Sequence, residues 1–356
     1  MKALSANEKL VLYGLVQYPT LNDRELSERI GLNHWTVNKI RNRLRWLGAY
    51  RTVRVPYLQH LGAEIFGVFY GRFPPFTINE TTVSALKKMQ SEFEEVIYVA
   101  NELNQGFAFS VAGDYTSIKR DIYLFNRICQ MQKSSVIDVN SVLFSFHLAT
   151  FLRFFDYAPL LRHTFGLDLG EGEEMVPPPM ISSKWHLNMQ EKRVFYSLVR
   201  YPEMPDKNVA EMVGTTRQFV TKNRKRFEEA GLLKTMRIPD LKKLGFKVLA
   251  LGHIRFRGDI ELRDIKNHPY AMRYENNIIL AVMEEYESVF LGVFKTFAES
   301  KKVVSRIIEK KDLREYFLGT PNILLFSIPD LLIGRELAFE HITRKMLFGG
   351  CYQVLI

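Results

Sequence analysis

The chain has 356 residues, which suits two to four domains of about 100–200 residues each rather than one. Its 47% hydrophobic and 25% charged residues are typical of a soluble globular protein, and no apolar run approaches the roughly 18 residues that span a membrane. The first residues lack the apolar segment of a signal peptide, so we expect a cytoplasmic protein without a membrane partner. The net charge of +10 suits an anionic partner, while Cys129 and Cys351 stand far apart without metal-ligand spacing.

Three short helices are predicted at the start of the chain from apolar residues at three- and four-residue spacing. The first ends near Pro19, the second at Gly31, and the third begins near Asn33 and ends at Gly48. Two helices joined by a tight glycine turn and followed by a short basic β segment are the pattern of a winged helix-turn-helix. We assign this domain to residues 1–62.

The outward face of the third helix carries side chains that suit DNA. Asn and Arg match the edges of adenine and guanine, and Lys neutralises phosphate. The predicted DNA-binding residues of this helix and of the following wing are His34, Trp35, Asn38, Lys39, Asn42, Arg43, Arg51 and Arg54. The alternative is a solvated helix face whose charges contact nothing.

After residue 62 the pattern changes to strands and helices in the order β-α-β-β-α-β. Strands are predicted at 65–73, 96–102, 106–112 and 136–145, and helices at 83–93 and 117–131. This order is typical of a ferredoxin-like sandwich, so the fold class is α+β. We assign residues 63–165 to a ferredoxin-like regulatory domain with a C-terminal helix.

The second half of the chain repeats the first. A shift of 183 positions aligns residues 8–62 with residues 191–245 without a gap, and 22 of the 55 positions are identical. The repeat predicts a second winged helix-turn-helix at 187–245 and a second ferredoxin-like domain with a C-terminal helix at 246–356. A linker at 166–186 contains three consecutive prolines, which cannot form a helix.

The exposed residues of the second recognition helix and wing differ from those of the first. They are Arg217, Gln218, Thr221, Lys222, Lys225, Arg226, Lys234 and Arg237. Residues 1–62 and 184–245 carry net charges of +6 and +7, and the rest of the chain carries −3. A basic excess confined to these regions is typical of a nucleic-acid binder, so we predict double-stranded DNA as the partner and an operator with two unlike half-sites.

The combination of these two domains resembles the Lrp/AsnC family of bacterial and archaeal transcription regulators, here present twice in one chain. The residues that carry the resemblance are Leu4-Ser5, Glu8-Lys9, Leu44, Gly48, Leu61-Gly62 and Ala112-Gly113-Asp114-Tyr115. It implies a sequence-specific transcription regulator in which one chain does what a homodimer does elsewhere in the family.

The resemblance also implies a small-molecule effector site. Gly113 and Asp114 match the glycine-aspartate turn that lies near effectors in the family, although such a hairpin turn needs no ligand. The second half has Lys295 and Thr296 instead, so the two halves are not expected to bind an effector equally.

Each half ends in a further aromatic-rich segment, at residues 146–165 and 330–348. We expect the first of these to be helical until Pro159, and both to serve either as core or as the contact of a homo-oligomer.

Two other classes of function were weighed. Some Lrp-like folds resemble subunits of haem-pathway decarboxylases, but the eight histidines show no paired ligand spacing, and no Walker, GxGxxG or GxSxG motif occurs. A charged recognition face in both copies also has no evident use in a decarboxylase. The sequence therefore predicts no catalytic residue, no metal, no cofactor and no enzyme, with two alternatives kept: an Lrp-like enzyme of the haem-pathway decarboxylase type, or an RNA-binding or adaptor protein.

Overall fold

The computed structural model describes residues 4–72, 93–102, 104–131, 138–168, 185–258, 275–309 and 315–349. The helix expected at 83–93 and most of the linker expected at 166–186 lie outside these ranges. Among the described residues, no helix has the length and apolar character that crossing a bilayer requires.

Three helices and a strand begin each half, as the repeat predicts. They are α1 (Ala6–Gln17), α2 (Asp23–Ile30), α3 (His34–Trp46) and β1 (Tyr50–Pro56), then α7 (Met189–Arg200), α8 (Asp206–Val213), α9 (Arg217–Glu229) and β7 (Leu233–Pro239). A short 3-10 helix, η1 (Leu58–Leu61), follows β1. Ser5 and Asn22 begin α1 and α2 with capping boxes, and Gly31 ends α2 in the left-handed conformation that favours glycine.

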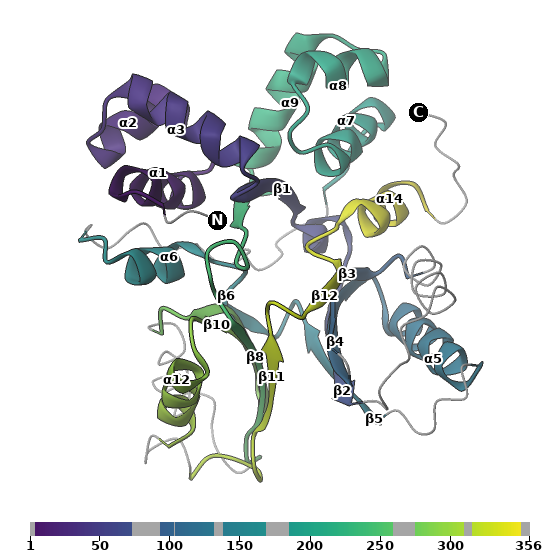
Figure 1. Ribbon diagram of the computed structural model, residues 1–356. Coiled ribbons are helices and arrows are strands. Elements are labelled where there is room, and N and C mark those ends of the chain that lie inside the picture. Colours follow the sequence, from purple (N-terminus) through teal and green to yellow (C-terminus); the bar gives the residue numbers. More distant parts are fainter. Residues whose placement is uncertain are drawn as a thin grey trace. The chain divides into compact units, whose positions relative to one another are not determined.

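Each half continues with the elements of a ferredoxin-like sheet. The first half contains β2 (Ile65–Arg72), β3 (Val96–Glu102), β4 (Gln105–Ala112), α5 (Tyr115–Met131) and β5 (Asp138–Ser145). The second contains β8 (Val248–Arg255), β9 (Ile278–Glu284), β10 (Glu287–Phe294), α12 (Phe297–Glu309) and β11 (Asn322–Ser327). The fold is therefore a mixed α/β fold with two ferredoxin-like sheets (Figure 1).

The two halves exchange an edge strand. β6 (Thr150–Arg153) follows the first half in sequence but pairs with β9, giving the order β11-β8-β10-β9-β6. Reciprocally, β12 (Leu332–Arg335) from the second half pairs with β3, giving β12-β3-β4-β2-β5.

A buried arginine fixes each exchanged strand. Arg153 donates from Nη1 to the carbonyl oxygens of Glu275 and Ile278, at 2.6 and 2.5 Å. Arg335 makes the same pair of bonds in the other sheet, to the carbonyls of Phe93 and Val96.

The chain therefore forms two compact units, each assembled from both halves. The first unit contains residues 1–53, 149–178 and 235–329, and the second contains residues 54–148, 179–234 and 330–356. Each three-helix segment thus shares a unit with the sheet of the opposite half.

The aromatic-rich segments differ from the sequence expectation. Residues 146–165 are not helical up to Pro159, because they contain the strand β6 and then α6 (Ala158–Phe165). Pro159 lies in the first turn of α6, where a missing N–H group costs nothing, so it begins this helix rather than breaking one.

The second of these segments contains β12 and then α14 (Glu340–Phe348), which packs on α7. There Lys192 donates from Nζ to the carbonyl of Leu347 at 2.8 Å, and the rings of Tyr196 and Phe348 lie 6.1 Å apart. Both contacts lie within the second unit, and homo-oligomer formation through this segment stays a prediction.

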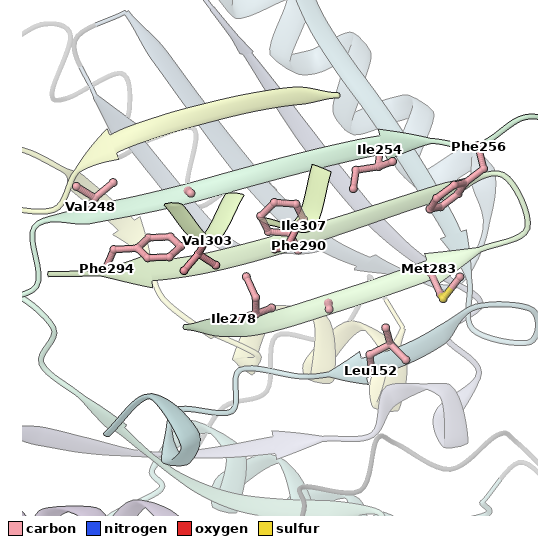
Figure 2. Packing of buried hydrophobic residues seen from close by; sticks show 12 residues of the cluster. Leu152, Val248, Ile254, Phe256, Ile278, Met283, Phe290, Phe294, Val303 and Ile307 are labelled. Carbon is pink, nitrogen blue, oxygen red and sulfur yellow. The ribbon is translucent and has the colours of Figure 1, made fainter. Parts of the chain in front are cut away.

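The core of the first unit lies between its sheet and α12. Phe290 and Phe294 of β10 pack with Val303 and Ile307 of α12, and Leu152 of the exchanged strand β6 joins the same cluster (Figure 2). On β8, Val248 and Ile254 point into the same cluster. Because side chains alternate along a strand, the residues of β8 and β10 that lie between these cluster residues face the opposite side of the sheet.

Candidate functional site

The predicted DNA-binding residues of α3 divide into exposed side chains and side chains that bond within the helical segment. His34, Trp35 and Lys39 are exposed, and the Trp35 side chain is 74% accessible. Asn38 is half-buried and donates from Nδ2 to Asp23 Oδ2 at 2.7 Å, and the amide of exposed Asn42 donates to Asn38 Oδ1 at 3.2 Å.

The second copy divides in the same way. Arg217, Gln218, Lys222 and Lys225 are exposed on α9. Thr221, at the position of Asn38, donates from its hydroxyl to Asp206 Oδ2 at 2.8 Å.

One predicted arginine in each copy forms an ion pair with a helix-capping glutamate. Arg43 lies 2.9 Å from Glu8, which is buried, and Arg226 lies 2.7 Å from Glu191. Both the arginine and the glutamate are identical in the two copies of the repeat. Part of the positive charge that the copies share therefore neutralises an internal carboxylate.

The predicted wing arginines lie against helices. Arg54 donates from Nη1 to the carbonyl of Leu198 on α7 at 3.4 Å, and Arg237 donates to the carbonyl of Leu15 on α1 at 3.2 Å. Burial lowers the pKa of Arg54, with the charge of nearby Arg224 as the second cause. Arg51 and Lys234, the other two predicted wing cations, are half-buried. DNA contact by any of these residues stays a prediction.

The predicted effector residues lie at the start of α5. Asp114 accepts hydrogen bonds from the backbone N–H of Ser117 at 2.8 Å and from its hydroxyl at 3.2 Å, as a helix cap does. A Cβ added at Gly113 would lie 3.7 Å from the carbonyl oxygen of Gly62 and from the sulfur of Met346. Effector binding at this turn stays a prediction.

A group of polar side chains that the sequence analysis did not single out lies at one end of the first unit's sheet. It consists of His253, Arg255, Glu287 and Asn322, which we call the histidine cluster. Strand register places Asn322 opposite His253 and Glu287 opposite Arg255, on the face that turns away from α12. His253 is buried, and its Nε2 lies 3.7 Å from Oε1 of Glu287, whose side chain is 38% exposed.

Apolar residues continue this face of the sheet beyond the histidine cluster. Leu249 and Leu251 precede His253 on β8, and Val289 and Leu291 follow Glu287 on the antiparallel strand β10. All four side chains are buried. The face therefore brings one buried imidazole, one arginine and one carboxylate together beside a floor of buried apolar side chains. That combination suits binding a carboxylate and moving a proton.

The sheet of the second unit carries a related but different set at the same register positions. Tyr70 replaces His253 and Gln105 replaces Glu287, while Arg72 and Asn140 match the arginine and asparagine. The floor beyond them is aromatic, since Phe66 stacks on Phe109 at 5.8 Å and Tyr98 stacks on Phe107 at 5.6 Å. Only the first unit thus has an imidazole among the residues of this face.

A buried pair of carboxyl groups lies on the opposite side of the second unit's sheet. Glu95 is fully buried and pairs with Lys345 of α14 and with Arg120, whose Nη2 lies 3.3 Å away. Burial, and next the charge of Glu95, raise the pKa of Asp121 to about 8. In the first unit Asn277 takes the position of Glu95 and bonds to the carbonyl of Val293 and to Glu299, so this pair belongs to one unit only.

The described residues contain no group of three or more His, Cys, Asp or Glu side chains that could hold a metal ion. His60 and His253 are the buried histidines of this part of the chain. Burial lowers the pKa of His60, and neither of its ring nitrogens makes a hydrogen bond.

Comparison with solved structures gives matches over the full length of the chain. The crystal structure of the siroheme decarboxylase NirDL is 12% identical, covers 96% of this chain and 98% of its own, and has a TM-score of 0.51. NirDL in co-complex with an iron-uroporphyrin III analogue gives 12% identity, coverage of 96% and 99%, and a TM-score of 0.53. An AsnC family transcriptional regulator from Agrobacterium tumefaciens is 13% identical over 39% of this chain and 90% of its own, with a TM-score of 0.33. No protein-family model and no curated protein sequence matches the chain.

The fold is similar to that of the siroheme decarboxylase NirDL over both halves of the chain. The prediction that this chain is no enzyme is contradicted by this likeness, because an enzyme has the same architecture over both halves. That prediction assumed that charged recognition helices have no use in a decarboxylase. Several of those charges have another use, since Arg43, Arg226 and Arg54 bond to groups within their own units.

Proposed function

We propose that this chain is an enzyme that decarboxylates a tetrapyrrole bearing several carboxylates. The observation that carries the proposal is the likeness to a siroheme decarboxylase over 96% of the chain, including both sheets and both three-helix segments. The histidine cluster supports it, because it offers the groups that such a reaction needs.

The reaction needs a held carboxylate, a poorly solvated reacting group and a proton. The bond between carbon and the carboxylate breaks, CO2 leaves, and the electron pair that stays on carbon takes up a proton. No oxidant or reductant takes part. Removing water from a carboxylate destabilises its charge, and this favours the loss of CO2.

We assign these roles within the first unit. Exposed Arg255 binds a carboxylate of the substrate, the apolar floor of Leu251 and Leu291 excludes water, and His253 donates the proton. Glu287, at 3.7 Å from Nε2, orients the imidazole.

The test is anoxic incubation of the purified chain with siroheme, followed by mass spectrometry of the tetrapyrrole. We expect successive losses of CO2 in the presence of the protein only. His253→Gln should abolish turnover while the absorbance change on binding siroheme persists, and His147→Gln, at an exposed histidine, should behave as the wild type. An unchanged tetrapyrrole with the wild-type protein would refute the proposal, and full activity of His253→Gln would refute the assignment of the proton donor.

DNA binding is the second candidate function, as expected from the sequence. The observation that favours it is the exposure of Arg217, Lys222 and Lys225 along one helix, together with Trp35 and Lys39 on α3. Such cations neutralise backbone phosphates, and the differing residues of the two helices suit unlike half-sites.

Fluorescence anisotropy of duplex DNA against salt concentration tests this function. The double variant Lys222→Ala, Lys225→Ala should reduce the slope of log affinity against log salt by about 2. Selection from random duplexes should return two unlike half-sites. A wild-type protein that shows no salt-dependent binding, or a variant with an unchanged slope, would exclude DNA binding through α9.

A further inference from the structure

A basic hollow lies within the second unit, beside the amino-terminal ends of α8 and α9. Its volume is about 460 Å³, and its lining residues are Arg54, Met204, Pro205, Asp206, Lys207, Arg217 and Arg224. Four cationic side chains therefore face one carboxylate.

That carboxylate is already bound. Asp206 accepts hydrogen bonds from Arg224 at 3.0 Å and from Thr221 at 2.8 Å, and these bonds keep its pKa below the usual range in spite of its burial. Arg224 also pairs with Glu228 at 3.3 Å. The charge of Arg224 is thus balanced by acids of the unit itself.

Arg54 forms no hydrogen bond to either acid. Its one hydrogen bond within the described part of the chain is the long one to the carbonyl of Leu198, and its Nε is buried without a hydrogen-bond partner. Burial and next the charge of Arg224 lower the pKa of Arg54, while the charges of Glu228 and Asp206 offset this only in part. Arg217 is exposed at the first position of α9.

The two copies of the repeat differ in the backbone of this hollow. In the first copy Asn22 caps α2 by accepting from the backbone N–H groups of Arg24 and Glu25, each at 3.0 Å. In the second copy Pro205 takes that position, and α8 has no side-chain cap. The N–H of Lys207 therefore lacks the side-chain acceptor that Arg24 has, whereas the N–H of Asn208 bonds to the carbonyl of Pro205 at 2.9 Å. A free N–H at a helix start attracts anions.

We propose that this hollow is a binding site for a phosphate group. Arg54 and Arg217 supply the charge, and the backbone N–H of Lys207 in the first turn of α8 supplies a further donor. A tetrahedral dianion has enough acceptor oxygens to bond to all three at once. The proposal does not depend on the decarboxylase function, because it uses none of the residues assigned to that reaction.

The probe is inorganic phosphate, titrated by calorimetry into the full chain with chloride at equal ionic strength as the reference. We expect saturable binding by the wild type and roughly tenfold weaker binding by Arg217→Ala, because a charge-assisted bond is lost. Arg193→Ala removes the same charge from an exposed position on α7 of the same unit, outside the hollow, and should bind phosphate as the wild type does. Pro205→Asn restores the side-chain cap of the first copy and should also weaken binding, without loss of folding stability.

Absence of saturable phosphate binding by the folded wild type would overturn the proposal, as would equal loss in Arg217→Ala and Arg193→Ala. A phosphate group can come from a free phosphorylated molecule or from the backbone of DNA. A short duplex separates these sources. If phosphate displaces the duplex and Arg217→Ala weakens both, the site takes a backbone phosphate. If duplex binding is absent or unaffected while phosphate binds, the site takes a free phosphorylated ligand.

Discussion

Replacing Arg153 by methionine should destabilise the sheet of the opposite half of the sequence. The arginine is 8% exposed and donates to the carbonyl oxygens of Glu275, just before β9, and of Ile278, at its start. Methionine keeps the volume of the aliphatic stem, so the loss is mainly that of two charge-assisted bonds. Removing the donor from the buried carbonyl of Ile278 costs about 1–3 kcal/mol, whereas the carbonyl of Glu275 keeps the backbone N–H of Ile278 at 3.1 Å.

The loss in unfolding free energy is about 2 kcal/mol. This corresponds to a fall of roughly 4–8 °C in the melting temperature of a unit of this size. Circular dichroism on heating measures the shift, and hydrogen exchange should show faster opening of β9, whose residues lie more than a hundred positions away in sequence.

Arg255→Met is the matched control, because Arg255 is exposed on the same sheet and should change stability by less than about 0.5 kcal/mol. If Arg153→Met were no more destabilising than Arg255→Met, the exchanged strand would not be held as described.

Three further predictions concern the site and the packing around it. Because the pKa of Asp121 is raised, the folded protein keeps a proton that the unfolded chain loses near pH 4, so stability falls as the pH rises from about 4 to about 8. Asp121→Asn should flatten that decline in urea unfolding at a series of pH values, and parallel curves would contradict the raised pKa. Gly252→Ala should lower stability by about 1–3 kcal/mol, since its Cβ would lie 2.2 Å from the ring of Phe290, and an unchanged melting temperature would show that the ring can move away. Arg226→Gln should destabilise the second three-helix segment more than Lys225→Gln in thermal unfolding, because only Arg226 neutralises Glu191; equal effects would mean that this ion pair does not contribute.

The repeat and the order of elements could be predicted from the sequence because they depend on local patterns. Gly31 and Gly48 ended their helices where expected, and β2 to β5 lie within a few residues of the bounds predicted for the first half. The exchange of β6 and β12 could not be predicted, since either partner sheet satisfies the alternation of a four-residue strand.

Less of the candidate site could be predicted from the sequence. His253 and Glu287 stand far apart in the chain, and only the register of β8 with β10 brings them together. The charges of Arg43 and Arg226 were visible, but their partners Glu8 and Glu191 lie on another helix of the same segment. A cation on a predicted helix face does not reveal whether it meets a ligand or an internal carboxylate.

The proposed activity is tested most directly by incubating the chain with siroheme in deuterium oxide and recording the mass of the tetrapyrrole product. Decarboxylation with proton uptake predicts that every carboxylate lost as CO2 is replaced by one deuteron, with no such product in the absence of the protein. Recovery of siroheme with its carboxylates intact, from a folded protein that binds it, would contradict the account.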